Sequence, residues 1–326
     1  MISEKKSIYF FIIFLLLALF PWIIEESFYL EQLTRILILG VFAMSLDLLV
    51  GYTGIVSLGH AAFYGVGAYT LACVFQSADV INFWYALPLS LAASALSATI
   101  IGWLSIRTSG VYLLMITLAF GQMCYFFYLE SPYCNGSDGI LLLNKPEILW
   151  GAYNLLDLEN ETHFYFFVLG WFVAVFLLLK RILQAPFGQI IQGICANESR
   201  VRGLGYSTPT YKLVSFVIAG TLAGLAGFLE AAHTGFVTPA YSHWHQSGML
   251  LVILILGGIR TLHGPVLGAA AIVLLEDLLP NITDHWKLLM GLLIIVIVLF
   301  LPNGTVSFFT RIPTQSAIQY KNKKHE

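Results

Sequence analysis

Long apolar blocks with few or no charged residues follow one another along most of this 326-residue chain. The hydrocarbon core of a bilayer is ~30 Å thick, so a helix needs about 20 apolar residues to cross it. Several of the blocks reach or approach that length. Only 10% of the residues are charged and 58% are hydrophobic, whereas soluble domains carry about 25% charged residues. A water-soluble protein of this size could not bury so much apolar surface in one core, so we predict an all-α integral membrane protein.

The apolar blocks predict about ten transmembrane helices, some of them short or broken. They are residues 7–24, 33–50, 55–75, 84–103, 109–129, 164–183, 211–231, 246–258, 264–279 and 286–301. The first follows Lys5 and Lys6 in the manner of a signal peptide, but no small-residue cleavage site comes after it, so we interpret it as an uncleaved helix. The last blocks are short and glycine-rich. Interrupted backbone is tolerated at membrane depth only where it is buried in protein or lines a wet cavity.

The basic residues are distributed unevenly between the two sides of such a bundle. With the N-terminus in the cytoplasm, thirteen of the 16 lysines and arginines fall on the cytoplasmic side. Only Arg35, Lys145 and Lys287 fall outside. Because cytoplasmic loops carry an excess of lysine and arginine, we predict that both termini are cytoplasmic and that the number of spans is even.

Two polar loops interrupt the predicted transmembrane domain, which comprises residues 1–309. Loop 130–163 lies outside and carries six acidic residues against one lysine. Loop 184–210 lies in the cytoplasm, and its middle is predicted to form a polar helix of about two turns that stops at Gly205. Residues 310–326 form a polar cytoplasmic tail.

Several sequence patterns that carry enzymatic chemistry are missing. No Gly-Lys dipeptide occurs, so the phosphate-binding loop GxxxxGK[ST] is absent and the chain cannot hydrolyse ATP by that route. HExxH, GxSxG and HxE…CxxC are absent as well. The cysteines (Cys73, Cys124, Cys134 and Cys195) include no CxxC pair, so we expect neither a metal site nor a disulfide framework. We predict that the protein is not an enzyme and has no cofactor.

The stretch 51–70, GYTGIVSLGHAAFYGVGAYT, combines five glycines with interleaved alanines. Small residues let membrane helices approach closely, so one interpretation is a tightly packed interior helix. The other is a helix beside a translocation path, with polar edges supplied by Tyr52, Ser57, His60 and Tyr69. Asp47 precedes the stretch, and an ionisable residue at membrane depth is a functional candidate. His60 can equally be a neutral, hydrogen-bonded structural imidazole, and both interpretations stay open.

Loop 184–210 is the second polar feature. Its predicted helix carries Glu198, Arg200 and Arg202 and lies between two long spans. Such a loop is either a solvated connector anchored by its charges or a docking site for a soluble partner. The length of the loop, its helix-like core and the missing phosphate loop favour docking, with Glu198, Arg200, Arg202 and Gly205 as the coupling residues.

Three patterns suggest other classes of protein. Residues 50–54, VGYTG, resemble the potassium filter TVGYG, but the threonine is misplaced and ten spans do not suit a tetrameric pore. His233, His243 and His245 lie in the outer loop after the seventh segment and would ligate zinc in a membrane enzyme, although no acid or cysteine lies close by. An ion-coupled secondary transporter that works alone would use Asp47 and His60 as proton carriers.

Five blocks of sequence resemble one known family, in family order. LLVGYTGIVSLGHAAFYGVGAYT resembles the signature of the branched-chain amino acid ABC transporter permeases, specifically of their LivM-type subunit. RTSGVYLLMITLAFGQM is similar to the segment that follows it, and NGSDGI is similar to a turn of the family. PFGQIIQGICANESRVRGLGYSTPTYKLVSFVIAGTLAGLAGFL resembles the coupling loop with its next span, and LVILILGGIRTLHGPVLGAA resembles the late glycine-rich segment. The resemblance runs from about Leu37 to Gly304.

The resemblance implies a multi-pass permease of the bacterial inner membrane that pairs with a LivH-type sister permease. Two ATP-binding subunits would bind at the cytoplasmic face, with Glu198 through Gly205 in the ATPase groove. A periplasmic binding protein would deliver branched-chain or related hydrophobic amino acids from outside. Membrane lipid is the remaining partner, and nucleic acid is not expected.

Four positions depart from the family pattern. Asp47 stands where the family often has asparagine, and Gln122 stands where it often has glutamate. Asn135 and Ser137 replace the usual threonine and glycine of the turn. These exchanges alter charge or turn chemistry near the presumed path, to which we assign Gln122. They leave the substrate open, because related permeases of this architecture carry urea or short amides.

Overall fold

The computed structural model describes residues 26–75, 82–142, 145–150, 153–154 and 157–300, together with Pro21 and Gly304. The predicted first helix at 7–24 lies outside these residues, apart from Pro21. The predicted tail at 310–326 also lies outside them.

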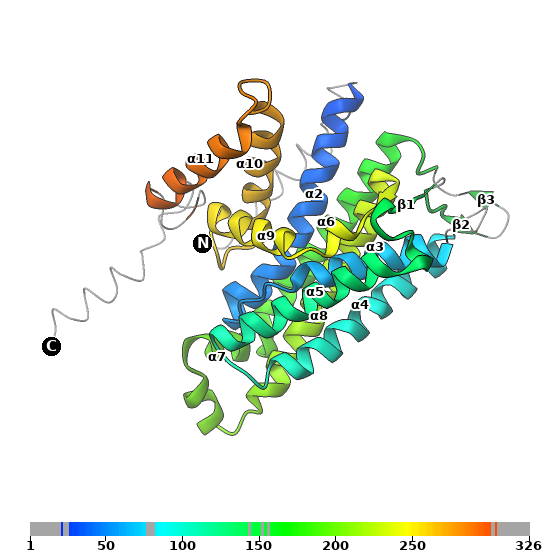
Figure 1. Ribbon diagram of the computed structural model, residues 1–326. Coiled ribbons are helices and arrows are strands. Elements are labelled where there is room, and N and C mark those ends of the chain that lie inside the picture. The colour runs from blue at the N-terminus through cyan, green and yellow to red at the C-terminus, as the bar shows by residue number, and fades with distance from the viewer. Residues whose placement is uncertain are drawn as a thin grey trace, which may run out of the picture.

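Ten helices form most of the described part of the chain (Figure 1). They are α2 (Ser27–Asp47), α3 (His60–Phe75), α4 (Phe83–Ser105), α5 (Val111–Glu130), α6 (Glu161–Gln184), α7 (Pro186–Gly203), α8 (Thr208–Thr234), α9 (Trp244–Gly257), α10 (Gly264–Leu278) and α11 (Trp286–Phe300). Nine of the ten predicted apolar segments fall on these helices, one segment to each helix. The additional helix, α7, lies in the loop 184–210.

Within the described residues, five helical stretches are long and apolar enough to cross a membrane. They are residues 27–53, 83–105, 111–130, 161–184 and 208–234. These stretches and the shorter apolar helices agree with the predicted class, a helical membrane protein. Four helices (α3, α9, α10 and α11) have only 14 to 16 residues. At 1.5 Å per residue they measure ~21–24 Å, which is less than the ~30 Å of a bilayer core, so the number of spans stays a prediction.

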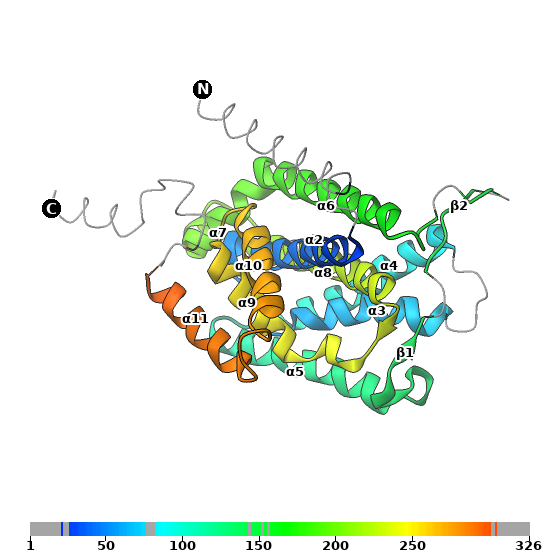
Figure 2. The same cartoon turned by 90° about the horizontal axis from the view of Figure 1, so that it is seen from above.

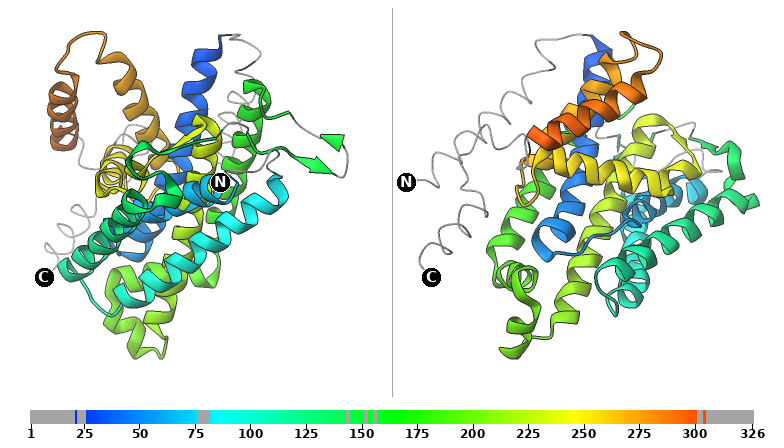
Figure 3. Two further views of the ribbon diagram at one scale, coloured as in Figure 1. Left: turned by 45° about the vertical axis from the view of Figure 1, so that its right-hand side comes forward. Right: turned by 60° about the vertical axis from the view of Figure 1, so that its left-hand side comes forward.

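The bundle is arranged around α2, against which α6, α8, α9 and α10 pack (Figure 2). On the other side of α8, α3 packs against α8, α4 and α5. α11 lies at the edge, where it contacts α9 (Figure 3). The most deeply buried of the five long stretches are therefore the two that include α2 and α8.

The glycine-rich stretch 51–70 is not one helix, contrary to our expectation. α2 continues into η1, a π-helical segment at Leu48–Thr53, which ends at Gly54 with a φ of +76°. Glycine takes this left-handed conformation without a steric cost. The N–H of Ile55 closes the wide turn by donating to the carbonyl oxygen of Leu49 at 2.8 Å. The chain is then irregular until α3 begins, so the first glycines of the stretch break a helix and only the later ones lie within one.

The glycines inside α3 and α8 bring these two helices into backbone contact. A Cβ atom on Gly67 of α3 would lie 2.7 Å from both the carbonyl carbon and the Cα of Gly224 in α8. A Cβ atom on Gly227 of α8 would lie 2.7 Å from the carbonyl carbon of Tyr64 in α3. Real Cβ atoms essentially never approach so closely. This part of the stretch therefore packs as the interior-helix interpretation predicts.

The loop 130–163 contains short structured segments. They are η2 (Pro132–Cys134), η3 (Gly136–Asp138), β1 (Ile140–Leu141), β2 (Leu149–Trp150) and β3 (Tyr153–Asn154). β1 pairs antiparallel with β4 (Phe236–Val237), which follows α8, and β2 pairs antiparallel with β3. A further turn, η4 (Pro239–Ser242), leads into α9. The loop is thus fastened to the chain that follows α8.

Candidate functional site

Asp47, the last residue of α2, is fully buried and faces the turn between α9 and α10. Its Oδ1 accepts a hydrogen bond from the backbone N–H of Arg260 at 3.0 Å. Gly51 leaves room for this contact, because a Cβ atom there would lie 2.9 Å from the same nitrogen. Arg260 has a φ of +67°, a left-handed conformation that is costly for a residue with a side chain. Asp47 therefore fastens a strained turn to the end of α2.

His60 begins α3 and is also fully buried. The hydroxyl of Ser45 donates to the carbonyl oxygen of Phe42 at 2.6 Å, so its oxygen is free to accept from Nε2 of His60, which lies 2.8 Å away. The imidazole also stacks on Phe42, with 5.7 Å between the ring centroids. These contacts join α2 to α3 and favour the structural interpretation of His60.

The other predicted path residues lie at separate places in the bundle. Tyr52 is partly buried on η1, and Ser57 is fully buried in the connector before α3. Tyr69 of α3 stacks on Tyr128 of α5, with 3.9 Å between the centroids and 4° between the ring planes. Gln122 is partly buried on α5. None of the six predicted residues, Asp47 and His60 included, lines either of the two cavities described next.

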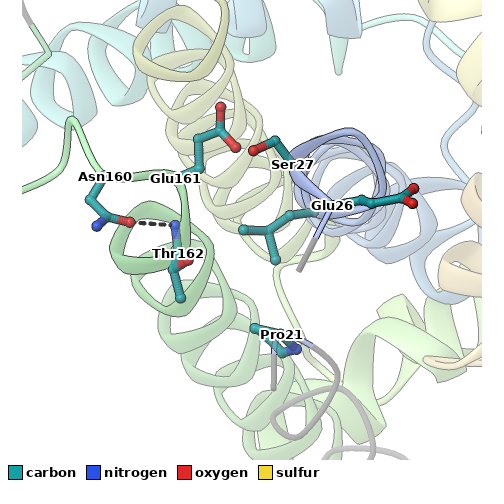
Figure 4. Close-up of a pocket in the computed structure, with 7 residues that line it drawn as sticks. Pro21, Glu26, Ser27, Asn160, Glu161 and Thr162 are labelled. Atoms are coloured by element: carbon teal, nitrogen blue, oxygen red, sulfur yellow. Dashed lines mark hydrogen bonds between the residues drawn. The ribbon is translucent and has the colours of Figure 1, made fainter. Parts of the chain in front are cut away.

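An open cavity of about 350 Å³ lies between the start of α2 and the start of α6 (Figure 4). It is lined by Pro21, Glu26, Ser27, Leu30, Asn160, Glu161 and Thr162. In Figure 4 the side chains of Glu161 and Ser27 point toward one another. Asn160 caps α6, because its Oδ1 accepts from the N–H of Thr162 at 3.0 Å. These polar groups lie at the N-terminal ends of α2 and α6.

The second cavity, of about 500 Å³, lies beside the loop 184–210. It is lined by Trp103, Ile106, Arg107, Glu198, Arg202, Pro209, Thr210, Lys212 and Leu213. The guanidinium of Arg107 lies 4.0 Å above the ring of Trp103. The cavity therefore lies between the end of α4, the end of α7 and the start of α8.

The loop 184–210 holds a longer helix than the sequence predicts. α7 begins at Pro186 and is kinked at Asn197, whose φ of −161° and ψ of 98° are not helical. Oδ1 of Asn197 accepts from the N–H of Arg200 at 3.1 Å, so this residue caps the second half of the helix. That half ends just before Gly205, which has a φ of +90°. The predicted two-turn helix is thus present as the second half of a kinked one.

Glu198 fastens the second half of α7 to the start of α8. Its Oε2 accepts from Nζ of Lys212 at 2.6 Å, and its Oε1 accepts from the hydroxyl of Thr208 at 2.9 Å and from Arg202 at 3.0 Å. Partial burial by itself raises the pKa of this carboxyl group. The hydrogen bonds from Lys212, Thr208 and Arg202 outweigh burial and lower the pKa of Glu198 below its usual value. The carboxylate is therefore charged at neutral pH.

The first half of α7 packs against η1. The sulfur of Cys195 lies 3.9 Å from the carbonyl oxygen of Gly51. A Cβ atom on Gly54 would lie 3.1 Å from the same sulfur. Because Gly51 also lies beside Asp47, contacts run without a gap from α7, through η1, to the turn between α9 and α10.

The end of α7 presents charged and apolar side chains to solvent. Arg200 and Arg202 are exposed. Leu204 is 76% exposed and Tyr206 is 43% exposed. These exposed side chains are therefore available to contact another protein.

The three histidines of the zinc alternative do not meet. His233 stacks on Phe164, with 5.7 Å between the centroids. His243 caps α9, since its Nδ1 accepts from the N–H of His245 at 3.3 Å. Among the residues that the structure describes, no group of three histidine, cysteine or acidic side chains could hold a metal ion. The described residues therefore give the zinc-enzyme alternative no support.

Sequence reasoning missed the partners of several predicted residues. The pair of Glu198 and Arg202 has the four-residue spacing of a helical ion pair and could have been predicted. Lys212 is one of the thirteen basic residues that are predicted to be cytoplasmic, and no local sequence pattern links it to Glu198. The contacts of Cys195 and Ser45 have no sequence signal either, because they depend on how the helices pack.

The similarity of the chain to known proteins extends over most of its length. The family model described as "Branched-chain amino acid transport system / permease component" matches residues 28–299. The high-affinity branched-chain amino acid transport system permease protein LivM of Salmonella typhimurium is 26% identical over 321 residues, which cover 93% of this chain and 75% of that protein. The LivM protein of Escherichia coli K12 has the same identity and coverage. A probable LivM of Methanocaldococcus jannaschii is 22% identical, over 82% of this chain and 89% of its own.

A second kind of relative also matches. The autoinducer 2 import system permease protein LsrC of Salmonella paratyphi B is 24% identical, over 87% of this chain and 82% of its own. No solved structure matches. Because the family model covers most of the sequence, this chain belongs to the family of permease components of branched-chain amino acid transport systems.

Proposed function

We propose that this chain is the LivM-type half of the membrane pore of an ABC importer, and that it carries branched-chain or related hydrophobic amino acids across the inner membrane. Its family and its similarity to three LivM proteins support this function. The observation that carries the proposal is α7, a kinked helix outside the long bundle helices, fastened to α8 by Glu198 and in contact with η1. A chain without a phosphate loop needs a separate ATPase subunit, and α7 is a surface on which that subunit can act.

Coupling would run along the contacts of α7. The ATPase would bind the exposed end of α7, which carries Glu198, Arg200 and Arg202 and is followed by Gly205. A push on α7 would be transmitted by Cys195 to η1, and from Asp47 to the turn at Arg260. Packed segments of this kind transmit small displacements, because close-packed interiors yield little. In our proposal the two permease halves then rock between outward-open and inward-open states.

Three of the predicted path residues, at separate places in the bundle, carry buried polar groups that a translocation path would satisfy. The side-chain oxygens of Ser57 and Tyr69 and the Nε2 of Gln122 are buried and have no hydrogen-bond partner among the described residues. An unsatisfied polar group at membrane depth is costly. We therefore assign these groups, with Tyr52, to a path that opens to water and substrate in another state of the cycle. Asp47 and His60 would hold the segments that move.

The partners follow from the same proposal. Both termini and α7 would lie in the cytoplasm, where two ATP-binding subunits would dock. The loop 130–163 would face the periplasm and meet the substrate-binding protein. A LivH-type sister permease and lipid would cover the apolar sides of the bundle. α5 is the least buried of the five long helical stretches, which makes it a candidate face for that sister subunit.

The test uses the complete transporter in proteoliposomes. Glu198→Lys and a deletion of residues 196–204 should abolish uptake and the stimulation of ATPase activity by substrate-loaded binding protein. Asp284→Lys reverses an exposed charge in the turn between α10 and α11, which belongs neither to α7 nor to loop 130–163, and it serves as the control with normal coupling. Unchanged stimulation in the Glu198→Lys transporter would refute α7 as the coupling element.

The substrate class is tested with the same vesicles. Leucine, isoleucine and valine should stimulate the ATPase, whereas urea and acetamide should not. The similarity to permeases named for autoinducer 2 import makes that molecule a necessary comparison. Uptake by the purified single chain under a proton gradient, without ATP, would instead establish the ion-coupled alternative.

A further inference from the structure

Two cysteines that are far apart in the sequence meet at one end of the bundle. Cys73 lies in the last turn of α3, and Cys134 is the last residue of η2, 61 positions later. Their sulfur atoms are 2.6 Å apart. This separation is well inside the ~3.5–4.0 Å at which nonbonded carbon atoms normally rest, and sulfur is larger than carbon. The two thiols are therefore placed close to bonding distance without help from any local sequence pattern.

The backbone on both sides holds these thiols in place. Cys134 is 5% exposed, and its N–H donates to the carbonyl oxygen of Ser131 at 3.2 Å. One turn before Cys73, Tyr69 stacks flat on Tyr128, near the end of the helix that leads into η2. The approach of the two sulfur atoms thus depends on a fixed α3–α5 contact rather than on a freely moving loop.

The chemical environment of the pair follows from the proposed orientation, on which this inference rests. Loop 130–163 would face the periplasm, a compartment in which disulfides form and persist. Cys195 offers a natural comparison, because it lies on α7 and would be cytoplasmic. Cys124 lies within α5. Neither thiol of the close pair takes part in the proposed path or in the proposed coupling.

We propose that Cys73 and Cys134 form a disulfide in the membrane-inserted protein. Each thiol loses one proton and one electron as the bond between the two sulfur atoms forms. The two electrons and two protons pass by thiol–disulfide exchange to the disulfide of a periplasmic oxidoreductase, which leaves as a dithiol. The bond fastens η2 to α3. Together with the pairing of β1 and β4, it fixes the outer surface that the substrate-binding protein would meet.

The test counts thiols in the complete protein. Membranes are quenched in acid, denatured in detergent and alkylated with a maleimide of high mass, with and without prior reduction, so that burial does not affect labelling. Before reduction, two of the 4 cysteines should react, and peptide mapping should identify them as Cys124 and Cys195. After reduction all 4 should react. Cys73→Ser should make Cys134 reactive without reduction, and Cys134→Ser should do the same for Cys73. Labelling of all 4 cysteines before reduction would overturn the proposal.

A separate variant tests the orientation. Leu141→Cys, built in a chain in which Cys73 and Cys134 are serine, places a thiol at the exposed position of strand β1. A membrane-impermeant maleimide added outside intact cells with a permeable outer membrane should label it. If Leu141→Cys is labelled and the native pair is still reduced, the disulfide is refuted and the orientation stands. If Leu141→Cys is labelled only after the inner membrane is broken, the orientation and the disulfide inference both fail.

Discussion

Gly67→Ala gives the sharpest test of the helix packing at the centre of this permease. The added Cβ would lie 2.7 Å from the carbonyl carbon and from the Cα of Gly224 on the facing helix. Those atoms belong to backbone, so no side chain can rotate to make room. The hydroxyl of Ser90 in α4 also donates to the carbonyl oxygen of Gly67 at 2.9 Å, so a shift of α3 disturbs α4 as well.

The expected cost follows from ordinary packing energetics. Overpacking a tight interior costs about 1–3 kcal/mol, because helices must move apart or side chains must leave their preferred rotamers. The matched control is Gly170→Ala in α6, where nothing lies within 4 Å of the added carbon. Alanine is favoured over glycine inside a helix by about 0.5–1 kcal/mol, so this control should be neutral or more stable.

Thermal unfolding in detergent, followed by the loss of monodisperse protein, measures the difference. One kcal/mol shifts the midpoint of a domain of 150–250 residues by about 2–4 °C, so Gly67→Ala should unfold several degrees below wild type. Gly67→Ser should be at least as damaging, because it adds a larger group at the same point. Equal unfolding midpoints for Gly67→Ala and Gly170→Ala would show that α3 and α8 are not in backbone contact.

Three further predictions concern the polar contacts. The pKa of Glu198 is lowered in the folded protein, so its contribution to stability is present above the usual glutamate value of 4.5 and is lost as the pH falls through the lowered pKa. Amide-exchange protection of residues 198–212 should therefore hold from pH 8 to 5 and decline only as the pH falls through the lowered pKa of Glu198. Asp47→Ala removes the acceptor of the Arg260 N–H and should cost about 0.5–1.5 kcal/mol in thermal unfolding, whereas Asp47→Asn keeps an acceptor and should cost less. His60→Gln should leave the pH profile of uptake unchanged, and a shifted profile would favour proton coupling through this residue.

The helices could be predicted from the sequence because each apolar block carries its own signal. Block length and low charge locate α4, α6 and α8 to within a few residues of their observed bounds. The end of α7 was also predictable, since a polar helix followed by Gly205 carries a local stop signal. These features depend on neighbours in the sequence and on no distant contact.

The break between α2 and α3 could not be predicted in the same way. Glycine serves both a helix that packs closely and a chain that turns, so the composition of 51–70 does not separate the two uses. Gly54 turns the chain with a positive φ, whereas Gly67 stays helical and packs against α8. Only the surrounding helices decide between these roles. For the same reason the sequence did not predict that Cys73 and Cys134 meet.

The distribution of the polar contacts bears on how such a chain can be both stable and mobile. The α3–α8 contact is made by backbone atoms packed closely together, and it leaves little freedom for these two helices to slide. The contact between Asp47 and Arg260 is a single hydrogen bond that joins segments 213 residues apart. One such bond contributes about 0.5–1.5 kcal/mol and can be exchanged for a bond to water or substrate at similar free energy. Movement driven through α7 should therefore separate the turn at Arg260 from α2 before it separates α3 from α8. A cross-link between the turn at Arg260 and the end of α2 should stop transport, whereas a cross-link between α3 and α8 should not.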